Sequence, residues 1–425
     1  MTLESNKDIR LLVLTSSFPR FIGDHAGTFV YELANTLSKY GINTLVLAPL
    51  FNDQRFKNTK ISEKMGNLEV HRFRYFYPVR YQRLYRDGGF VHNLRSSNLA
   101  KIQLPLFVII QLYSAINIAI VQRVDIIHTH WMLPQGLTGA IIHKLLKKPH
   151  ILTVHAADVF ALAKMPFGTY LAQFIVKNSS KIFVVSNYVS QSLYDLLPES
   201  ALLDYNSKLT ILPMGVNTAI YQSELGISER DPIKKKKLTI LFIGRLNEKK
   251  GVIYLIQAMI KLNLFAKYLG VLICGDGPLR QDLERLTEAN QLNDMVEFKG
   301  FITDDEKIDY MQLADILVVP SIVMDSGETE GLPVVILEGL AAGKAIIASN
   351  VSGASDAIQD GYNGFLVEQK KPEHIAEKIM FIMNNPEIRE NIETNALSSS
   401  QKYDWSNISH QYEVAIKEAL NMADQ

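Results

Sequence analysis

The amino-acid sequence predicts an α/β protein made of two doubly wound domains, each with a mostly parallel sheet covered by helices on both faces. Three observations lead to this prediction. The chain has 425 residues, which exceeds what one ordinary hydrophobic core accommodates. Short apolar runs bounded by turn residues alternate with helical patterns along the chain. The polar residues 222–237, QSELGISERDPIKKKK, interrupt this alternation near the middle.

Composition and charge limit the classes of function. Hydrophobic residues make up 47% and charged residues 21%, which is typical of a well-packed globular protein. Lys plus Arg and Asp plus Glu number 44 each, which argues against a chain-wide polyanion-binding surface. The single cysteine, Cys274, excludes an intramolecular disulfide and a cysteine zinc site. The first apolar run, 9–14, is too short for a signal-peptide core, so we expect a buried strand there.

The first half of the chain alternates strands and helices. Predicted strands are 9–15, 43–48, 68–73, 125–128, 150–153, 181–185 and 208–212. Predicted helices are 27–40, 94–121, 136–146, 167–177 and 188–196. Residues 104–121 are almost long and apolar enough to span a membrane, but Gln111, Ser114 and Asn117 recur along them. We therefore predict a long, mostly buried helix and a cytoplasmic protein.

The alternation restarts after 222–237. Predicted strands are 238–243, 270–274, 295–299, 315–319 and 345–349. Predicted helices are 251–262, 278–289, one opened by the capping box TDDE at 303–306, one from 332, and 372–384, 386–399 and 405–422. Ligands of doubly wound sheets bind beyond the carboxyl ends of the strands. Functional residues are therefore expected in the loops that follow strands.

The segment EGLPVVILE, 330–338, carries two carboxylates around the start of a predicted helix. Pro333 fits the first turn and Gly343 follows the last, so the helix is well bounded. Its first amides lack intrahelical partners and suit a phosphate or pyrophosphate. Glu330 then meets sugar hydroxyls and Glu338 a ribose. The alternative is that Glu330 only complements the helix dipole and Glu338 is a solvated surface residue. Apolar runs on both sides of Glu338 argue against the second part.

Two further loops carry residues suited to a diphosphate. In GRLNEKKG, Arg245 and Lys250 leave a strand and approach a helix start, where they would neutralise a departing pyrophosphate. Lys249 lies one residue further from that helix and is the weaker candidate. In GDGP, 275–278, glycines allow close approach of backbone to a ligand. Taken singly, the first loop is also consistent with a solvated basic turn and the second with a simple turn.

Together these motifs resemble the family-four retaining glycosyltransferases of the GT-B fold. GRLNEKKG, GDGPLR, FKGFIT and the Glu330/Glu338 pair are joined, in the same order as in that family, by SSFPRFIGDHAGTFVYELANTLSKYG, DIIHTHWMLPQG, TVHAAD, VSNYV and LPMGVN in the first half. The resemblance spans about residues 9 to 405 and is greatest to bacterial enzymes of cell-surface polysaccharide assembly. It implies two Rossmann-like domains facing across a cleft: an acceptor domain, 1–213, with the helix 405–425 packed on it, and a donor domain, 214–404.

The resemblance also implies a role for individual residues. Glu330 and His155 would face the transferred sugar, as catalytic residues. Donor-binding residues would be Gly27, Arg245, Lys250, Gly277, Phe301, Gly331, Leu332, Pro333, Val334 and Glu338. His128, His130 and Asp158 would either line the cleft or buttress it. The chain departs from the family in MGVN at 214–217, and in SGASD at 352–356, where Asp356 stands for a common Glu.

The expected chemistry needs no metal and no cofactor besides the nucleotide-diphosphate sugar. No D-x-D pair occurs in the sequence, so Arg245, Lys250 and a helix N-terminus would meet the charge of the leaving group. The acceptor hydroxyl would attack on the face that the diphosphate leaves, with retention of configuration. A nucleotide-sugar epimerase and a non-catalytic nucleotide-sugar-binding protein are the alternatives. An NAD enzyme is disfavoured because no G-x-G-x-x-G follows the first strand.

Residues 71–101 combine basic and aromatic side chains. They contain six arginines and one lysine against the single acid Asp87, with six Tyr and Phe residues between Phe73 and Tyr85. In the context of the resemblance, this composition favours contact with a lipid-linked acceptor or an anionic membrane surface over an ordinary packed loop, and nucleic acid is not expected. The acceptor would be a glycan or a lipid-linked glycan, and the protein would be peripheral at the inner face of the membrane.

Overall fold

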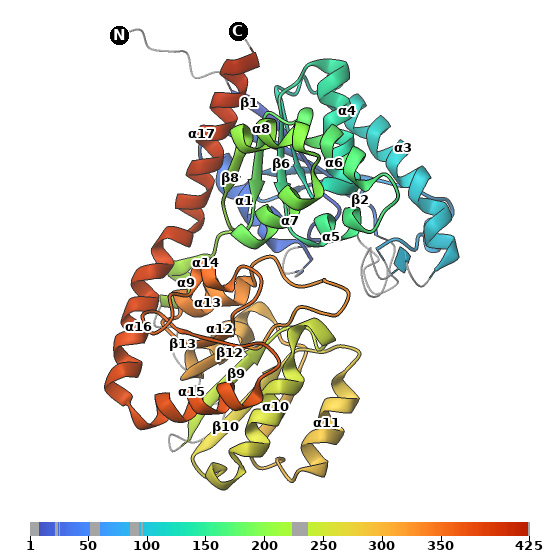
Figure 1. The fold of residues 1–425 in the computed structure, drawn as a ribbon. Helices are drawn as coiled ribbons and strands as arrows, with labels where there is room; N and C mark the ends of the chain where they lie inside the picture. Colours follow the sequence, from blue (N-terminus) through green and yellow to red (C-terminus); the bar gives the residue numbers. More distant parts are fainter. Residues whose placement is uncertain are drawn as a thin grey trace, which may run out of the picture. The chain divides into compact units, whose positions relative to one another are not determined.

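The computed structural model describes residues 8–21, 24, 26–51, 60–85, 93–94, 97–222 and 237–423, and it has two compact α/β units (Figure 1). The first unit comprises Met1–Val185, Val189–Leu212 and Ile408–Gln425. The second comprises Ser186–Tyr188 and Pro213–Asn407. The predicted fold class, two doubly wound domains with parallel sheets, is confirmed.

The first unit is built on an eight-stranded sheet in the order β3-β4-β2-β1-β5-β6-β7-β8. Every neighbouring pair is parallel except β3 and β4. The strands are β1 (Ile9–Leu14), β2 (Ile42–Pro49), β3 (Ser62–Met65), β4 (Leu68–Phe73), β5 (Ile126–His130), β6 (His150–Val154), β7 (Lys181–Val184) and β8 (Leu209–Ile211). All residues of β5 and β6 are buried, as parallel strands covered on both faces require.

Helices cover this sheet. They are α1 (Thr28–Ser38), α3 (Asn98–Val121), α4 (Leu137–Leu146), α5 (Ala157–Ala163), α6 (Gly168–Lys177), α7 (Asn187–Leu196), α8 (Glu199–Lys208) and, from Ile408 onward, α17 (Trp405–Ala423), with the short helices η2 (Val79–Tyr81) and η3 (Met132–Gly136). The hydroxyl of Ser97 caps α3 by accepting from the amide of Ala100 at 3.3 Å. Tyr412 of α17 is fully buried and packs on Phe183 of β7, with ring centroids 4.2 Å apart.

The second unit has a six-stranded parallel sheet in the order β11-β10-β9-β12-β13-β14. The strands are β9 (Leu238–Ile243), β10 (Leu269–Cys274), β11 (Val296–Gly300), β12 (Ile316–Val319), β13 (Ala345–Ser349) and β14 (Phe365–Val367). The helices are α9 (Thr218–Gln222), α10 (Val252–Lys261), α11 (Arg280–Ala289), α12 (Asp304–Leu313), α13 (Val334–Ala341), α14 (Ala354–Ala357), α15 (Pro372–Asn384) and α16 (Pro386–Ser400), with η4 (Glu248–Lys250), η5 (Asn263–Phe265) and η6 (Gln401–Tyr403). The predicted capping box opens α12, with Thr303 and Glu306 bonding each other's backbone amides.

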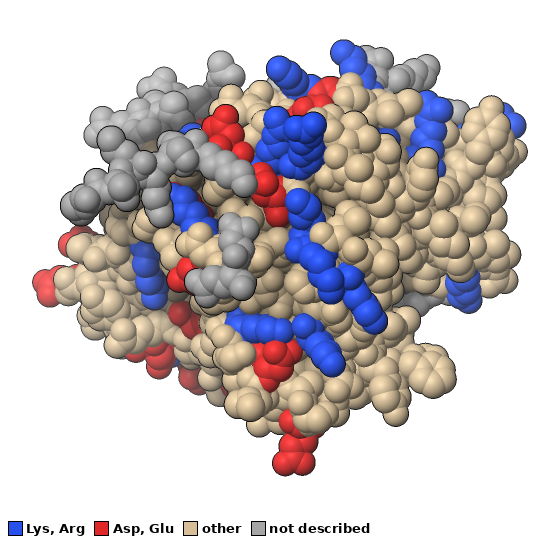
Figure 2. All heavy atoms as spheres, turned by 90° about the horizontal axis from the view of Figure 1, so that it is seen from above, with Lys and Arg blue, Asp and Glu red and all other residues tan. Residues whose placement is uncertain are grey.

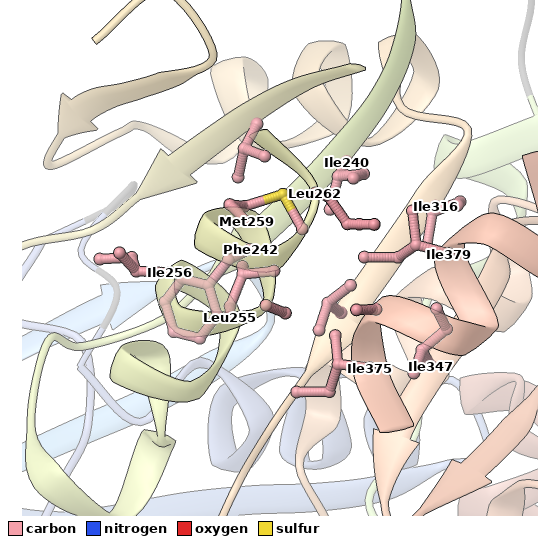
Figure 3. Packing of buried hydrophobic residues seen from close by; sticks show 14 of the residues in the cluster. Ile240, Phe242, Leu255, Ile256, Met259, Leu262, Ile316, Ile347, Ile375 and Ile379 are labelled. Carbon is pink, nitrogen blue, oxygen red and sulfur yellow. The ribbon is translucent and has the colours of Figure 1, made fainter. Parts of the chain in front are cut away.

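The core of the second unit lies on both faces of its sheet. On one face, β9 contributes Ile240 and Phe242, which pack against Leu255 and Met259 of α10 and Ile379 of α15 (Figure 3). The opposite face packs against α13. Cys274, the last residue of β10, is fully buried, and burial raises the pKa of its thiol to about 12.

The prediction for the long apolar helix was only half right. Residues 98–121 do form one helix, α3, but only 22% of its most apolar 18-residue window is buried. Among the described residues it is the one helix long and apolar enough to cross a membrane. The physical reason is that α3 is buried in the rest of the unit only along one stripe, so its other apolar side chains are partly buried or exposed.

Candidate functional site

The predicted donor-binding residues of the second unit gather at one edge of its sheet. Arg245 follows β9, Gly277 follows β10, Phe301 follows β11 and Glu330 lies between β12 and α13. These four strands are consecutive in the sheet and parallel, so their carboxyl ends meet at the same edge. The strand order reverses between β9 and β12, and such a switch point is where doubly wound sheets bind ligands.

Glu330 is held by two lysines at this switch point. One carboxylate oxygen lies 2.6 Å from Lys250 Nζ and the other lies 3.0 Å from Lys249 Nζ. Burial alone would raise the pKa of Glu330, but the charges of Lys250 and then Lys249 outweigh it and lower the pKa to about 2. Glu330 is therefore ionised at neutral pH. Lys249, which the sequence ranked below Lys250, is a direct partner as well.

Backbone packing places the two lysines beside Glu330. They lie in η4, whose C-cap residue Gly251 has a φ of 64°. A Cβ at Gly251 would come within 1.9 Å of Pro320 O, so only glycine allows this close approach to the residue after β12. The amide of Ile322 also donates to Lys249 O at 2.9 Å. These contacts tie the lysine turn after β9 to the segment that leads to Glu330.

The start of α13 differs in detail from the prediction. The helix begins at Val334, and Pro333 is its N-cap residue in an extended conformation. The first amide that bonds back within this turn is that of Ile336, which donates to Pro333 O at 3.0 Å. Pro333 has no N–H, so it has no amide to offer a diphosphate. Gly331, Leu332 and Val334 remain the predicted amide donors.

Glu338 has partners that the sequence did not reveal. Lys307 of α12 lies 2.7 Å from its carboxylate and also 3.3 Å from Asp304. Burial would lower the pKa of Lys307, but Glu338 outweighs that effect and raises it. Tyr221 of α9 faces the same carboxylate, and burial together with the charge of Glu338 raises the pKa of its hydroxyl. Glu338, whose side chain is only 12% exposed, is therefore a paired group rather than the solvated residue of the alternative.

The glycine loop after β10 has a structural reason for its composition. A Cβ at Gly275 would lie 1.9 Å from Gly244 O, and one at Gly277 would lie 2.4 Å from Leu246 O. The glycines therefore let this loop pack against the loop that carries Arg245. Arg245 is itself exposed. Phe301, 69% exposed, follows Gly300 at the end of β11.

Gly27 and His155 belong to the first unit, again in loops after strands. Gly27 precedes α1 with φ 67°, and a Cβ there would lie 2.2 Å from Ser17 O. This loop follows β1. The neighbouring β5 ends at His130 and is followed by Trp131, and the strand order of this sheet reverses between β1 and β5. His155 directly follows β6, the next strand along. The edge therefore has the same topology as the edge in the second unit.

His155 lies in a cluster of neutral rings. Its Nε2 is 3.0 Å from Nδ1 of His130, and its ring packs on Trp131 at 4.8 Å and Phe29 at 5.1 Å. Behind it, His128 bonds Thr153, which in turn bonds Tyr412. Burial lowers the pKa of both His155 and His128 to about 3. These histidines therefore act through hydrogen bonds at neutral pH, not through charge.

Asp158 joins the two loops of this cluster. Its carboxylate accepts from the amide of Met132 at 2.8 Å and from the amide of His155 at 3.2 Å. Trp131 and Ala156 have positive φ angles of 71° and 100°, a conformation that costs energy for residues with a Cβ. Asp158 stabilises these turns, so it supports the histidines from behind. Burial raises its pKa to about 6.

Comparison with known proteins decides the family. Residues 26–220 match the model for Glycosyltransferase Family 4, and residues 226–398 match the model for Glycosyl transferases group 1. An uncharacterized glycosyltransferase of Methanocaldococcus jannaschii is 33% identical over 289 residues, which cover 68% of this chain and 74% of the relative. The chain belongs to the family-four glycosyltransferases.

Other members and structures agree with this assignment. The alpha-monoglucosyldiacylglycerol synthase of Acholeplasma laidlawii is 24% identical over 66% of this chain and 72% of its own length. The sucrose-phosphate synthase of Thermosynechococcus elongatus superposes with a TM-score of 0.78 over 97% of this chain and 100% of its own, at 19% identity. The predicted GT-B fold of this glycosyltransferase is confirmed. In the part of the chain that the structure describes, no group of three His, Cys, Asp or Glu side chains has an arrangement suited to a metal ion.

Proposed function

We propose that this glycosyltransferase moves a sugar from a nucleoside-diphosphate sugar to a hydroxyl group of a glycan or lipid-linked acceptor, with retention of anomeric configuration. The observation that carries the proposal is the ionised Glu330 bonded to Lys249 and Lys250 at the switch point. Two ammonium groups and a carboxylate there match a substrate with a diphosphate next to a polyhydroxylated ring.

The diphosphate is assigned to the basic side of this site. Lys250 and Arg245 follow β9, and the first amides of α13 lie just beyond Glu330. When the bond between the anomeric carbon and the diphosphate oxygen breaks, negative charge grows on that oxygen, and these groups stabilise it. These positive groups of the chain then suffice to stabilise the leaving diphosphate, and the reaction needs no metal ion and no cofactor besides the donor.

Glu330 is assigned to the sugar hydroxyls, because an ionised carboxylate accepts hydrogen bonds only. The acceptor hydroxyl forms the new bond to the anomeric carbon on the face that the diphosphate leaves. Its proton passes to an oxygen of the departing diphosphate. This route keeps the anomeric configuration and forms no covalent bond between the sugar and Glu330.

Glu338 and His155 are assigned to the two ends of the donor. Glu338, oriented by Lys307, accepts from the ribose hydroxyls. His155, neutral and fixed by His130, exchanges a hydrogen bond with the sugar. The Acholeplasma laidlawii relative is an alpha-monoglucosyldiacylglycerol synthase, which makes a glycolipid. Together with the motif resemblance to polysaccharide enzymes, this supports a role in polysaccharide or glycolipid synthesis.

A panel of UDP-, GDP- and ADP-sugars tests the proposal by hydrolysis and by calorimetric binding. One nucleotide is expected to bind, with Glu330→Ala and Arg245→Ala abolishing turnover while thermal unfolding stays cooperative. Glu377→Gln, an exposed change on α15, is the matched control and should keep full activity. The anomeric configuration of the product, read by NMR, tests retention, and turnover in excess chelator tests metal independence. Near-normal turnover of Glu330→Ala would show that the site is wrongly assigned.

A further inference from the structure

Helix α3 exposes large apolar side chains and buries two glutamines, unlike an ordinary surface helix. The side chains buried against the unit are Ala100, Gln103, Phe107, Gln111, Ala115 and Ala119, and beside them Leu104, Ile110, Leu112, Ile116 and Ile118 are partly buried against the core. Two of these six buried side chains are glutamines. An amphipathic helix of a soluble protein normally buries its apolar residues and exposes its polar ones.

The buried stripe is joined to the unit by specific contacts. Gln103 accepts from the amide of Arg83 at 2.9 Å and donates to Tyr81 O at 2.7 Å. Gln111 accepts from the hydroxyl of Thr138 on α4 at 3.3 Å. Phe107 packs on Phe73, with ring centroids 5.0 Å apart. These contacts hold α3 against the unit along its whole inner side, so the helix lies on the surface and presents a defined outer face.

The outer face is mostly apolar from Ile102 to Val121, with the exposed Asn117 as its polar interruption. Its exposed large side chains are Ile102 at 67%, Leu106 at 40%, Ile109 at 62%, Tyr113 at 73%, Ile120 at 59% and Val121 at 66%. At about 1.5 Å per residue, the strip from Ile102 to Val121 is roughly 30 Å long. An exposed apolar strip of this length marks an interaction surface.

Positive charge and tyrosines border this strip. Residues 70–124 contain seven arginines and one lysine against one acid, Asp87. Lys101 and Arg123 are exposed at the two ends of α3, and Arg80 is exposed in η2, beside the first turns of the helix. Tyr77 and Tyr81 next to it are 82% and 42% exposed. On the side of Figure 2 where α3 lies, the coloured side chains are Lys and Arg on an otherwise uncharged surface.

The predicted contact segment 71–101 is not a uniform surface. Arg72 is buried, with its guanidinium 2.9 Å from Glu63 and 2.8 Å from Pro19 O, and Phe73 and Tyr75 belong to the core. Arg86 and Arg95 lie outside the described residues. Among the described arginines of the segment, Arg74 and Arg80 are exposed, and Arg80 adjoins α3.

We propose that the outer face of α3 is a membrane-docking surface, with its apolar side chains inserted among the acyl chains of an anionic bilayer and Arg80, Lys101 and Arg123 at the phosphate headgroups. An apolar face bordered by basic residues and tyrosines is the pattern of helices that lie in the plane of the interface. The inner contacts of α3 with its own unit set this orientation and oppose a spanning one. A second copy docked face to face would bring the two basic borders together, which disfavours self-association.

Vesicle binding of the full chain tests this surface directly. The probes are vesicles of phosphatidylcholine alone and of phosphatidylcholine with about 30% phosphatidylglycerol. The test variant Ile109→Glu/Tyr113→Glu changes two exposed positions of α3, and Leu203→Glu, 84% exposed on α8 of the same unit, is the matched control. Wild type and control are expected to sediment with the anionic vesicles, and the double variant should bind at least tenfold more weakly. Arg80→Gln should reduce only the dependence on phosphatidylglycerol.

A tryptophan at position 109 distinguishes insertion from adsorption. The fluorescence of Ile109→Trp should shift to the blue and be quenched by lipids brominated in the acyl chain, whereas that of Leu203→Trp should not change. Thermal unfolding of each variant checks that the fold is intact. Equal vesicle binding of the double variant and wild type would overturn the proposal. The proposal would also be overturned if the wild-type protein did not bind the vesicles. This includes the case in which the wild type forms a dimer that the double variant abolishes.

Discussion

Replacing Glu330 by Gln removes the counter-charge of two lysines while it keeps the size of the side chain. The pKa of Glu330 is about 2, against an ordinary value of 4.5. At about 1.36 kcal/mol per pKa unit, the gap amounts to roughly 3 kcal/mol in favour of the folded state at neutral pH. Lys249 is 34% exposed and Lys250 17%, so solvent screens part of the interaction. We therefore expect the substitution to lower the free energy of unfolding by about 2 kcal/mol.

The effect should depend on pH in one direction. Because the pKa of Glu330 is depressed by folding, its contribution is fully present above pH 4.5 and is lost as the pH falls from 4.5 toward 2. The difference between wild type and Glu330→Gln should therefore be constant at neutral pH and smaller at the lowest pH where the second unit remains folded.

Urea unfolding followed by the fluorescence of Trp405 measures this difference. Trp405 belongs to the second unit and Trp131 to the first, so a Trp131→Phe background isolates the signal. Glu377→Gln, exposed on α15, is the control and should stay within about 0.5 kcal/mol of wild type. Ionic pairing would not explain the depressed pKa if Glu330→Gln were as stable as this control at neutral pH. The same conclusion would follow if the difference in free energy of unfolding between wild type and Glu330→Gln were as large at low pH as at neutral pH.

Three further predictions concern other parts of the two units. Lys307→Met should release Glu338 from its ion pair and weaken the binding of a ribonucleoside diphosphate about tenfold in calorimetry. Binding of a 2′,3′-dideoxy analogue should be unaffected, and equal losses of affinity for both ligands would contradict a ribose contact. Burial lowers the pKa of His150 from 6.5 to about 4. The contribution of neutral His150 to folding stability is therefore fully present above pH 6.5 and is lost as the pH falls toward 4. Between about pH 7 and about pH 5, the free energy of unfolding in urea should fall by about 2 kcal/mol more for the wild type than for His150→Gln. Gly139→Ala places a Cβ 2.4 Å from His150 Nε2 and should destabilise the first unit by about 1–3 kcal/mol. The midpoint of urea unfolding, followed by the fluorescence of Trp131, measures this loss. An unchanged midpoint would mean that His150 moves aside freely.

The fold was largely predictable, because buried parallel strands appear as continuous apolar runs. β10 and β13 are buried at every position and their positions were predicted to within one residue. Elements with weaker patterns were missed. β3, SEKM, is an edge strand with one buried residue, and α8, ESALLDYNSK, buries only two. Their structure is determined by neighbours in space, which periodicity does not report.

The candidate site was predictable in part for the same reason. Motifs placed Glu330 and Lys250 in loops after strands, and topology then brings them together across 80 residues of sequence. Lys307 and Tyr221 were missed because each forms its contact with Glu338 from a separate helix, with no local signal. The exposure of α3 was also missed. Counting apolar residues does not reveal which side of a helix meets the sheet, and here the buried side includes Gln103 and Gln111.

The burial of Cys274 has a practical consequence for labelling. With its pKa raised to about 12, the thiol stays protonated at neutral pH, and thiolates are the species that react with maleimides. Because the sequence has no other cysteine, one placed at an exposed position such as Ile109 or Leu203 would be the only accessible thiol in the chain. A fluorophore or spin label can therefore be attached at one chosen position without first removing the native cysteine.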